Sequence, residues 1–197
     1  MTVCIAAICE AGHTIVLAAD RELAVSYTSA EFDGKWLPLY DDWSIAISGT
    51  VHHATHVVSA ARRLRKDMET TMSWDVQTFL AKAYRQARMA TAEARFLANR
   101  GWTLDEFVKN GGRQMPVDTY ATIDAQMSLY NFDADLLVAG YGKDDLGPSI
   151  ISVTNPGVTS DHTKLGFRCI GSGATAAQMS LFSREYSWRF SVEKAVY

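Results

Sequence analysis

Residues 1–20 of the chain read MTVCIAAICEAGHTIVLAAD. Two runs rich in apolar and β-branched residues, at 2–9 and 14–20, flank the polar, glycine-containing segment 10–13. Such runs favour strands and such a segment favours a turn, so the sequence predicts a β-hairpin. The hairpin begins with Thr2, a residue small enough for an aminopeptidase to expose by removing Met1.

A free Thr2 would carry a hydroxyl and a primary amine on the same residue. The hydroxyl of threonine is a weak nucleophile until a base takes its proton, and the α-amino group can be that base. The start of the chain therefore predicts an N-terminal nucleophile at Thr2.

Four further features follow along the chain. Asp20 ends the second predicted strand, Lys35 follows an Asp-Gly pair, and Gly49 ends an apolar run. Much later, Ser172 lies in a Gly-Ser-Gly turn at 171–173. Each feature alone is typical of caps, hairpins and turns, so the ordered set, rather than any one residue, indicates chemistry.

In this order, the features resemble the β-type subunits of proteasomes and their bacterial homologues, which are N-terminal nucleophile hydrolases. The resemblance covers nearly the whole chain. It implies catalytic roles for Thr2, Asp20, Lys35 and Ser172. The hairpin before Asp20 is longer than is usual in the family.

The resemblance also implies two roles for the strand that ends at Gly49. The backbone N–H of Gly49 would stabilise the oxyanion of the reaction, and the spacing from Lys35 to Gly49 matches the family. Ile47 would lie at the base of the primary substrate pocket, which favours a neutral or apolar substrate side chain.

These roles are chemically consistent with one another. The ordinary pKa of an α-amine is about 7.7–8.0, so a nearby Lys35 cation would favour its uncharged, basic form. A buried lysine in turn needs an anionic partner, for which Asp20 is the natural candidate.

The remaining pattern predicts strands, then helices, then strands, then helices. Strands are expected at 36–40, 43–48, 135–142, 149–154 and 166–170, and an Ala-rich helix follows Ser172. Two long helices are expected from about Ala54 and Ser73, and the second has a predicted apolar stripe from Val76 to Ala94. This order predicts a layered α+β fold, and the resemblance implies a four-layer αββα sandwich.

We expect one domain over residues 1–197. The segment at about 101–124, which opens with a capping box from Thr103 to Glu106, is longer than the family requires and is predicted to be an insertion. The family has a supporting Asp and Ser at positions that would fall beyond Tyr197, so we expect a C-terminally truncated form.

Composition excludes several classes of protein. The formal net charge of −3 and pI near 5.9 argue against a nucleic-acid partner. The apolar run at 3–9 is too short for a signal-peptide core or a membrane span. Cys4, Cys9 and Cys169 are expected to be buried free thiols in a reducing compartment, which favours the cytoplasm.

No metal or other cofactor is expected. His52, His53 and His56 form a cluster, but the glutamate that follows the first histidine in the zinc-protease helix motif is absent. A helix start near the rim of the active site is the favoured interpretation of this cluster.

The sequence-based hypothesis is a threonine peptidase subunit that hydrolyses peptide bonds in peptides or unfolded proteins through an acyl-enzyme on Thr2. The resemblance implies self-assembly into a ring or spiral of identical chains, and it leaves any unfoldase partner unidentified. Two alternatives remain: a catalytically inactive structural subunit of the same type, and an amidase of small non-peptide amides.

Overall fold

The computed structural model describes residues 2–20, 22–25, 28–31, 35–40, 42–65, 73–143 and 147–196. Of residues 22–25 and 28–31, only the course of the backbone is described. Met1, whose removal the predicted chemistry requires, lies outside the described residues.

The N-terminal hairpin belongs to a three-stranded antiparallel sheet. It consists of β1 (Cys4–Cys9) and β2 (Thr14–Ala19), joined through the short 3-10 helix η1 (Glu10–Gly12). Strand β10 (Phe167–Ile170) pairs with the other edge of β1, so the sheet order is β10-β1-β2. This pairing brings the Gly-Ser-Gly turn, which directly follows β10, to the start of β1.

A second antiparallel sheet has five strands in the order β5-β6-β7-β8-β9. These are β5 (Trp36–Tyr40), β6 (Trp43–Gly49), β7 (Ala134–Tyr141), β8 (Pro148–Thr154) and β9 (Val158–Asp161). A separate two-stranded ribbon, β3 (Glu22–Val25) and β4 (Thr28–Glu31), follows β2.

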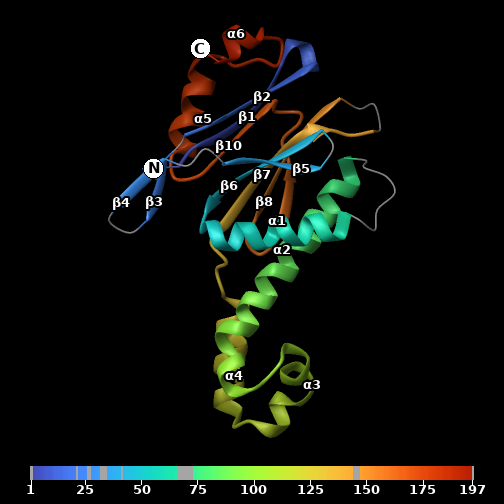
Figure 1. Ribbon diagram of the computed structural model, residues 1–197, viewed down its shortest axis with the longest axis vertical. Coiled ribbons are helices and arrows are strands. Elements are labelled where there is room, and N and C mark those ends of the chain that lie inside the picture. The colour runs from blue at the N-terminus through green and yellow to red at the C-terminus, as the bar shows by residue number, and fades with distance from the viewer. Residues whose placement is uncertain are drawn as a thin grey trace.

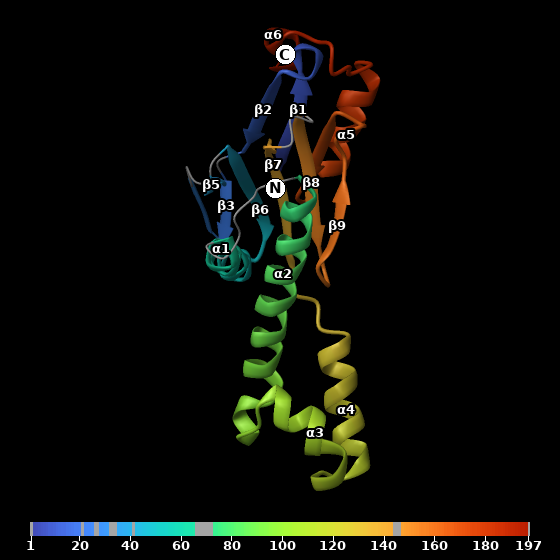
Figure 2. The same ribbon diagram turned by 90° about the vertical axis from the view of Figure 1, so that its right-hand side faces the viewer.

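The two larger sheets pack face to face (Figures 1 and 2). Alternation along β1 sends Cys4, Ala6 and Ile8 inward, where they pack with Leu137 and Ala139 of β7. The opposite face of the five-stranded sheet is covered by helices α1 (Val51–Arg65) and α2 (Ser73–Phe96). The central strands β6, β7 and β8 are therefore buried on both faces.

The second half of α2 runs beyond the sheets into a helical arm, shown at the bottom of Figure 2. The arm also contains η2 (Ala98–Arg100), α3 (Leu104–Gln114) and α4 (Val117–Ser128). The predicted capping box is confirmed: Thr103 accepts the N–H of Glu106, and Glu106 accepts the N–H of Thr103. Helices α5 (Ala174–Ser183) and α6 (Val192–Val196) lie at the other end of the molecule.

The expected four-layer αββα sandwich is wrong. The fold is a mixed one with two larger antiparallel sheets, and its helices do not form two continuous outer layers. Helix α2 has 24 residues and is about 36 Å long, so it extends past the sheet and carries α3 and α4 away from it. On the outer side of the three-stranded sheet, α5 has no buried residue.

The apolar stripe of α2 also differs from the prediction. The predicted stripe is buried from Val76 to Ala87, but Ala90 and Ala94 are exposed. In the arm, α2 instead buries Ala92, and Leu97 just beyond the helix is also buried. The buried face changes because the packing partner changes from a sheet to the helices of the arm.

Within the described residues, no helix is both long enough and apolar enough to cross a membrane.

Candidate functional site

Both backbone polar groups of Thr2 are held by the Gly-Ser-Gly turn. The N–H of Thr2 donates to Oγ of Ser172 at 2.9 Å, and its carbonyl oxygen accepts the N–H of Gly173 at 3.0 Å. The turn reaches Thr2 because the β1–β10 pairing aligns Cys4 with Ile170. Thr2 and Ser172, 170 positions apart in sequence, are thus direct neighbours.

Asp20 lies on the other side of the same strand start. Its Oδ1 accepts the N–H of Val3 at 2.7 Å, and its own N–H donates to the carbonyl of Val3 at 3.0 Å. These bonds continue the β1–β2 ladder past its last pair, Cys4 with Ala19. The carboxylate of Asp20 is therefore fixed next to the residue that follows Thr2.

Lys35 completes this group of side chains. Its Nζ lies 2.7 Å from Oδ2 of Asp20, and the exposed fractions of the two side chains are 5% for Lys35 and 27% for Asp20. A buried ammonium is costly unless it is paired and hydrogen-bonded, and Asp20 provides the pairing. The carboxylate of Asp20 thus joins Lys35 to the backbone just before β1.

The thiol of Cys4 lies close enough to Lys35 and Asp20 for both charges to affect its pKa. Burial raises the pKa of Cys4 to about 11; Lys35 acts to lower it and Asp20 to raise it. Cys4 is fully buried between the two sheets, directly beside the charged pair. Its thiol therefore stays protonated, and its Sγ donates weakly to the carbonyl of Ile47 at 3.7 Å.

The backbone of β6 places the N–H of Gly49 on the edge that faces Lys35. Antiparallel ladders alternate hydrogen-bonded and non-hydrogen-bonded pairs. The N–H of Thr50 donates to the carbonyl of Asp133 at 2.7 Å, so Thr50 and Asp133 form a hydrogen-bonded pair. The next pair along the ladder, Gly49 with Ala134, is therefore a non-hydrogen-bonded pair. The N–H of Gly49 accordingly points away from β7.

The opposite edge of β6 belongs to β5 and Lys35. The N–H of Ile47 donates to the carbonyl of Lys35 at 3.3 Å, and the N–H of Gly49, two residues further on, points to the same side. Residues 32–34, which precede Lys35, lie outside the described range. No described contact joins Gly49 directly to Thr2 or Ser172.

Glycine is required at position 49. Its φ is +83°, and a Cβ there would lie 2.5 Å from the carbonyl oxygen of Asp133. Asp133 itself has a φ of +48°, which is rare for a residue with a side chain. Its Oδ2 accepts the hydroxyl of Thr50 at 2.8 Å, so Asp133 holds Thr50 through both its backbone and its side chain.

Ile47 lies within β6, with its side chain in the core on the side of α1 and α2. Its exposed fraction is 4%, so the side chain is buried in the core. The N–H of Ile47 binds the carbonyl of Lys35 within the five-stranded sheet, and its carbonyl faces the thiol of Cys4 in the three-stranded sheet.

Sequence reasoning did not identify Asp133, Thr50 or Asn131. The side chain of Asn131 accepts the N–H of Asp133 at 3.0 Å and so supports its unusual backbone conformation. The motif Asn-Phe-Asp at 131–133 could have indicated this conformation from the sequence, because Asn and Asp favour such local hydrogen bonds.

The histidine cluster lies in the first half of α1. His53 is anchored, since its Nδ1 lies 2.6 Å from the carbonyl oxygen of Phe132. His52 and His56 are exposed. In the described parts of the chain, no group of three or more His, Cys, Asp or Glu side chains is placed to hold a metal ion.

No protein-family model matches the sequence, and no curated protein matches it significantly.

Proposed function

We propose that the chain is a threonine-type N-terminal nucleophile hydrolase that cleaves peptide bonds after Met1 has been removed. One observation carries the proposal: Ser172, Asp20 and Lys35 are gathered around the backbone of Thr2 and Val3 through hydrogen bonds of 2.7–2.9 Å. Ser172 lies 170 positions from Thr2 in the sequence, and the charged pair of Asp20 and the buried Lys35 lies beside the same strand start.

In the proposed reaction, the free amine of Thr2 takes the proton of its own hydroxyl. The resulting oxygen attacks the carbonyl carbon of the scissile peptide bond and forms a tetrahedral intermediate. The Lys35 cation, held by Asp20, favours the uncharged form of the amine before this step. Ser172, which lies 2.9 Å from the Thr2 nitrogen, orients that nitrogen.

The intermediate carries a negative oxygen that needs a preorganised donor. The N–H of Gly49 fills this role in the proposal, because it lies on the Lys35 edge of β6 and no side chain at position 49 obstructs the substrate. When the intermediate collapses, the ammonium of Thr2 gives its proton to the departing amine, and an ester on Thr2 remains. Water then hydrolyses the ester, with the amine acting again as base.

We further propose that the subunit assembles with copies of itself into a ring or spiral, in the cytoplasm, and acts on peptides or unfolded proteins. Large apolar side chains on the surface are consistent with subunit contacts, among them Trp74, which is 73% exposed. Light scattering tests the assembly: a lone particle of 21.8 kDa at micromolar concentration would contradict it.

The nucleophile is tested with two variants and a panel of short peptide amides and small non-peptide amides. Thr2→Ala should lower kcat by at least about 10³-fold, because the attacking oxygen is gone, whereas Thr2→Ser should keep measurable turnover. Circular dichroism serves as the folding control for both. Unchanged peptide hydrolysis by Thr2→Ala would reject Thr2 as the nucleophile, and wild-type turnover of the non-peptide amides alone would favour the amidase alternative.

A further inference from the structure

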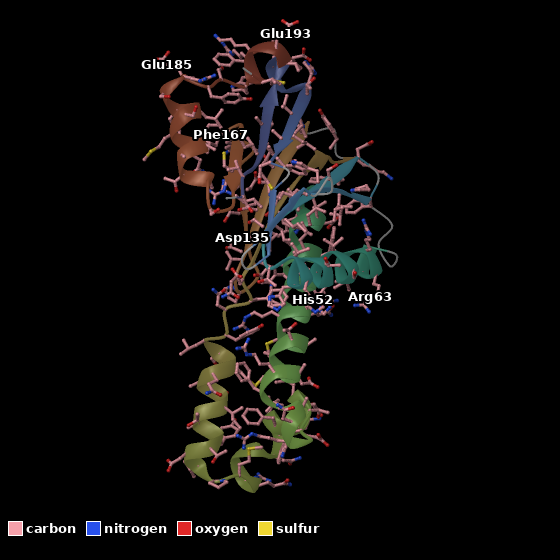
Figure 3. All side chains as sticks on the ribbon, turned by 60° about the vertical axis from the view of Figure 1, so that its left-hand side comes forward. His52, Arg63, Asp135, Phe167, Glu185 and Glu193 are labelled. Atoms are coloured by element: carbon pink, nitrogen blue, oxygen red, sulfur yellow. The ribbon has the colours of Figure 1, made fainter. Side chains whose placement is uncertain are left out.

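The exposed side of α1 carries two histidines on successive helical turns. His52 and His56 are four residues apart, and their ring centroids lie 4.2 Å apart with an interplanar angle of 59°. Figure 3 shows His52 and Arg63 toward opposite ends of the helix. Side chains at this spacing lie on one face of a helix, one above the other.

The distance between the rings is close to that of a metal chelate. Two imidazoles bound to one ion at about 2.0–2.1 Å and roughly 90–110° have centroids about 4.5–5 Å apart. The observed 4.2 Å requires only a small rotation of exposed side chains to reach this range. The same i, i+4 spacing on a helix supplies both imidazole ligands in known zinc sites.

Neither ring has to give up a partner to bind an ion. Among the described residues, His52 and His56 make no hydrogen bond or ion pair, and both side chains are exposed. His53 differs from them, because its Nδ1 contacts the carbonyl of Phe132 and its ring stacks on Phe132 at 4.6 Å. His52 and His56 can therefore bind one ion together, whereas His53 is held against Phe132.

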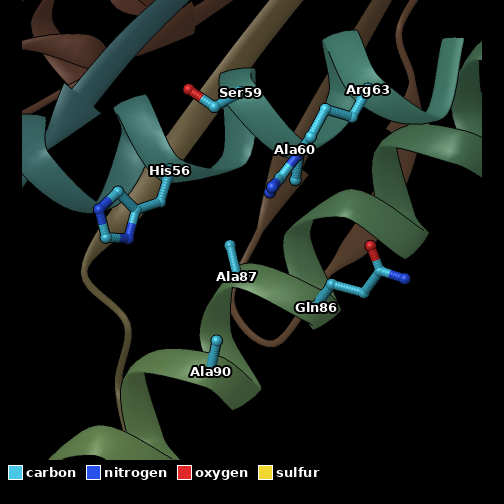
Figure 4. Close-up of a pocket in the computed structure, with 7 residues that line it drawn as sticks. All are labelled: His56, Ser59, Ala60, Arg63, Gln86, Ala87 and Ala90. Carbon is cyan, nitrogen blue, oxygen red and sulfur yellow. The ribbon is translucent and has the colours of Figure 1, made fainter. Parts of the chain in front are cut away.

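There is also space for the other ligands of an ion. His56 lines a groove of about 340 Å³ between α1 and α2, whose floor includes Ala60, Ala87 and Ala90 (Figure 4). The cation Arg63 also lines the groove, and the volume leaves room for water molecules beside His56.

We propose that His52 and His56 chelate one divalent first-row transition-metal ion per chain, with water completing the coordination. Imidazole suits Zn²⁺, Ni²⁺ and Cu²⁺, whereas Mg²⁺ and Ca²⁺ require oxygen ligands. The site therefore binds Cu²⁺ more tightly than Zn²⁺ and does not bind Mg²⁺. This inference is independent of the proposed peptidase activity.

The test uses the full chain purified without a histidine tag. Isothermal titration with Zn²⁺ and Cu²⁺ should give one equivalent per chain. His52→Gln and His56→Gln should each weaken binding of both ions at least about tenfold, because a second ligand on the same scaffold raises the effective ligand concentration. His13→Gln is the matched control, since His13 is an exposed histidine outside α1, and it should leave the affinity unchanged.

Two outcomes would overturn the proposal. One is that His52→Gln and His56→Gln both bind the ion with the wild-type affinity. The other is that His13→Gln loses as much metal affinity as these two variants. Circular dichroism of each variant checks that helix content is retained, and both positions are exposed enough for glutamine to be accommodated. Absorption of bound Co²⁺ gives a second readout, because its visible bands should disappear in His52→Gln and His56→Gln.

Discussion

The Nζ of Lys35 lies 2.7 Å from Oδ2 of Asp20, and the lysine side chain is only 5% exposed. The other oxygen of the same carboxylate accepts the N–H of Val3. A single carboxylate thus neutralises the buried cation that directly precedes β5 and fixes the backbone beside the proposed nucleophile. Stability and the proposed chemistry depend on the same group.

Asp20→Asn should therefore destabilise the fold strongly. The substitution leaves the Lys35 ammonium buried without its anionic partner, which should lower the free energy of unfolding by about 3 kcal/mol. Lys35→Met should cost less, because the carboxylate of Asp20 is partly exposed and keeps its bond to Val3. Urea denaturation of both variants measures the difference, and equal or reversed losses would contradict the pairing argument.

Ser172→Ala should affect turnover more than stability. Its Oγ is an exposed acceptor for the Thr2 nitrogen, so its loss should misorient the proposed base and lower kcat by about 100-fold. The free energy of unfolding should change by less than about 1 kcal/mol, as is usual for exposed positions. Ser183→Ala, at an exposed serine at the end of α5, is the control and should leave kcat unchanged. A wild-type kcat in Ser172→Ala would show that Ser172 is not part of the proposed active site.

Gly49→Ala should lower both stability and activity. The new Cβ would lie 2.5 Å from the carbonyl oxygen of Asp133 in a backbone conformation with φ of +83°, a strain of about 1–3 kcal/mol. Gly112→Ala is the matched control. A Cβ at Gly112 meets nothing within 4 Å, and alanine in a helix should raise stability by about 0.5–1 kcal/mol. Thermal unfolding of the two variants should therefore show shifts of opposite sign.

Lowering the pH should destabilise the protein through His162. Burial, and then the Arg168 cation, lower the pKa of His162 from its ordinary value of 6.5. The unfolded chain therefore binds a proton at a higher pH than the folded one, so stability is full above pH 6.5 and falls as the pH is lowered toward the folded pKa. His162→Gln should flatten this dependence in urea titrations at several pH values. An unchanged pH slope in that variant would contradict the assignment.

Much of the strand pattern could be predicted from the sequence. The apolar pattern is strong in β1 and β6, which are mostly buried, and in β2 and β5, whose apolar side chains are mostly half-buried. Strand β9 was missed because it has four residues, lies at the sheet edge and buries none of its side chains. The ribbon of β3 and β4 was also missed, since residues 22–31 contain no Gly, Pro, Asn or Asp to signal a turn.

The helical arm shows where local signals mislead. Gly111 and Gly112 indicate a helix break, yet α3 continues through both and ends at Gln114. A Cβ at Gly111 would lie 2.9 Å from the ring of Tyr120, so glycine lets α4 approach α3 closely. This requirement comes from tertiary packing, which the local pattern does not contain.

The proposed site was predicted in part. The pairing of Lys35 with Asp20 follows from the cost of a buried ammonium, and the turn at Ser172 follows from its glycines. The role of Asp133 could not be predicted, because it depends on a left-handed backbone at position 133 and on the register that pairs it with Thr50.

Intact-mass spectrometry of the purified chain, before and after treatment with a covalent inhibitor that reacts with N-terminal threonine, shows whether a free Thr2 acts as the nucleophile. We expect a mass lower by one methionine residue, and one inhibitor adduct per chain that maps to Thr2 and is absent in Thr2→Ala. A chain that hydrolyses peptides while it retains Met1 and forms no adduct at Thr2 would contradict this role of Thr2.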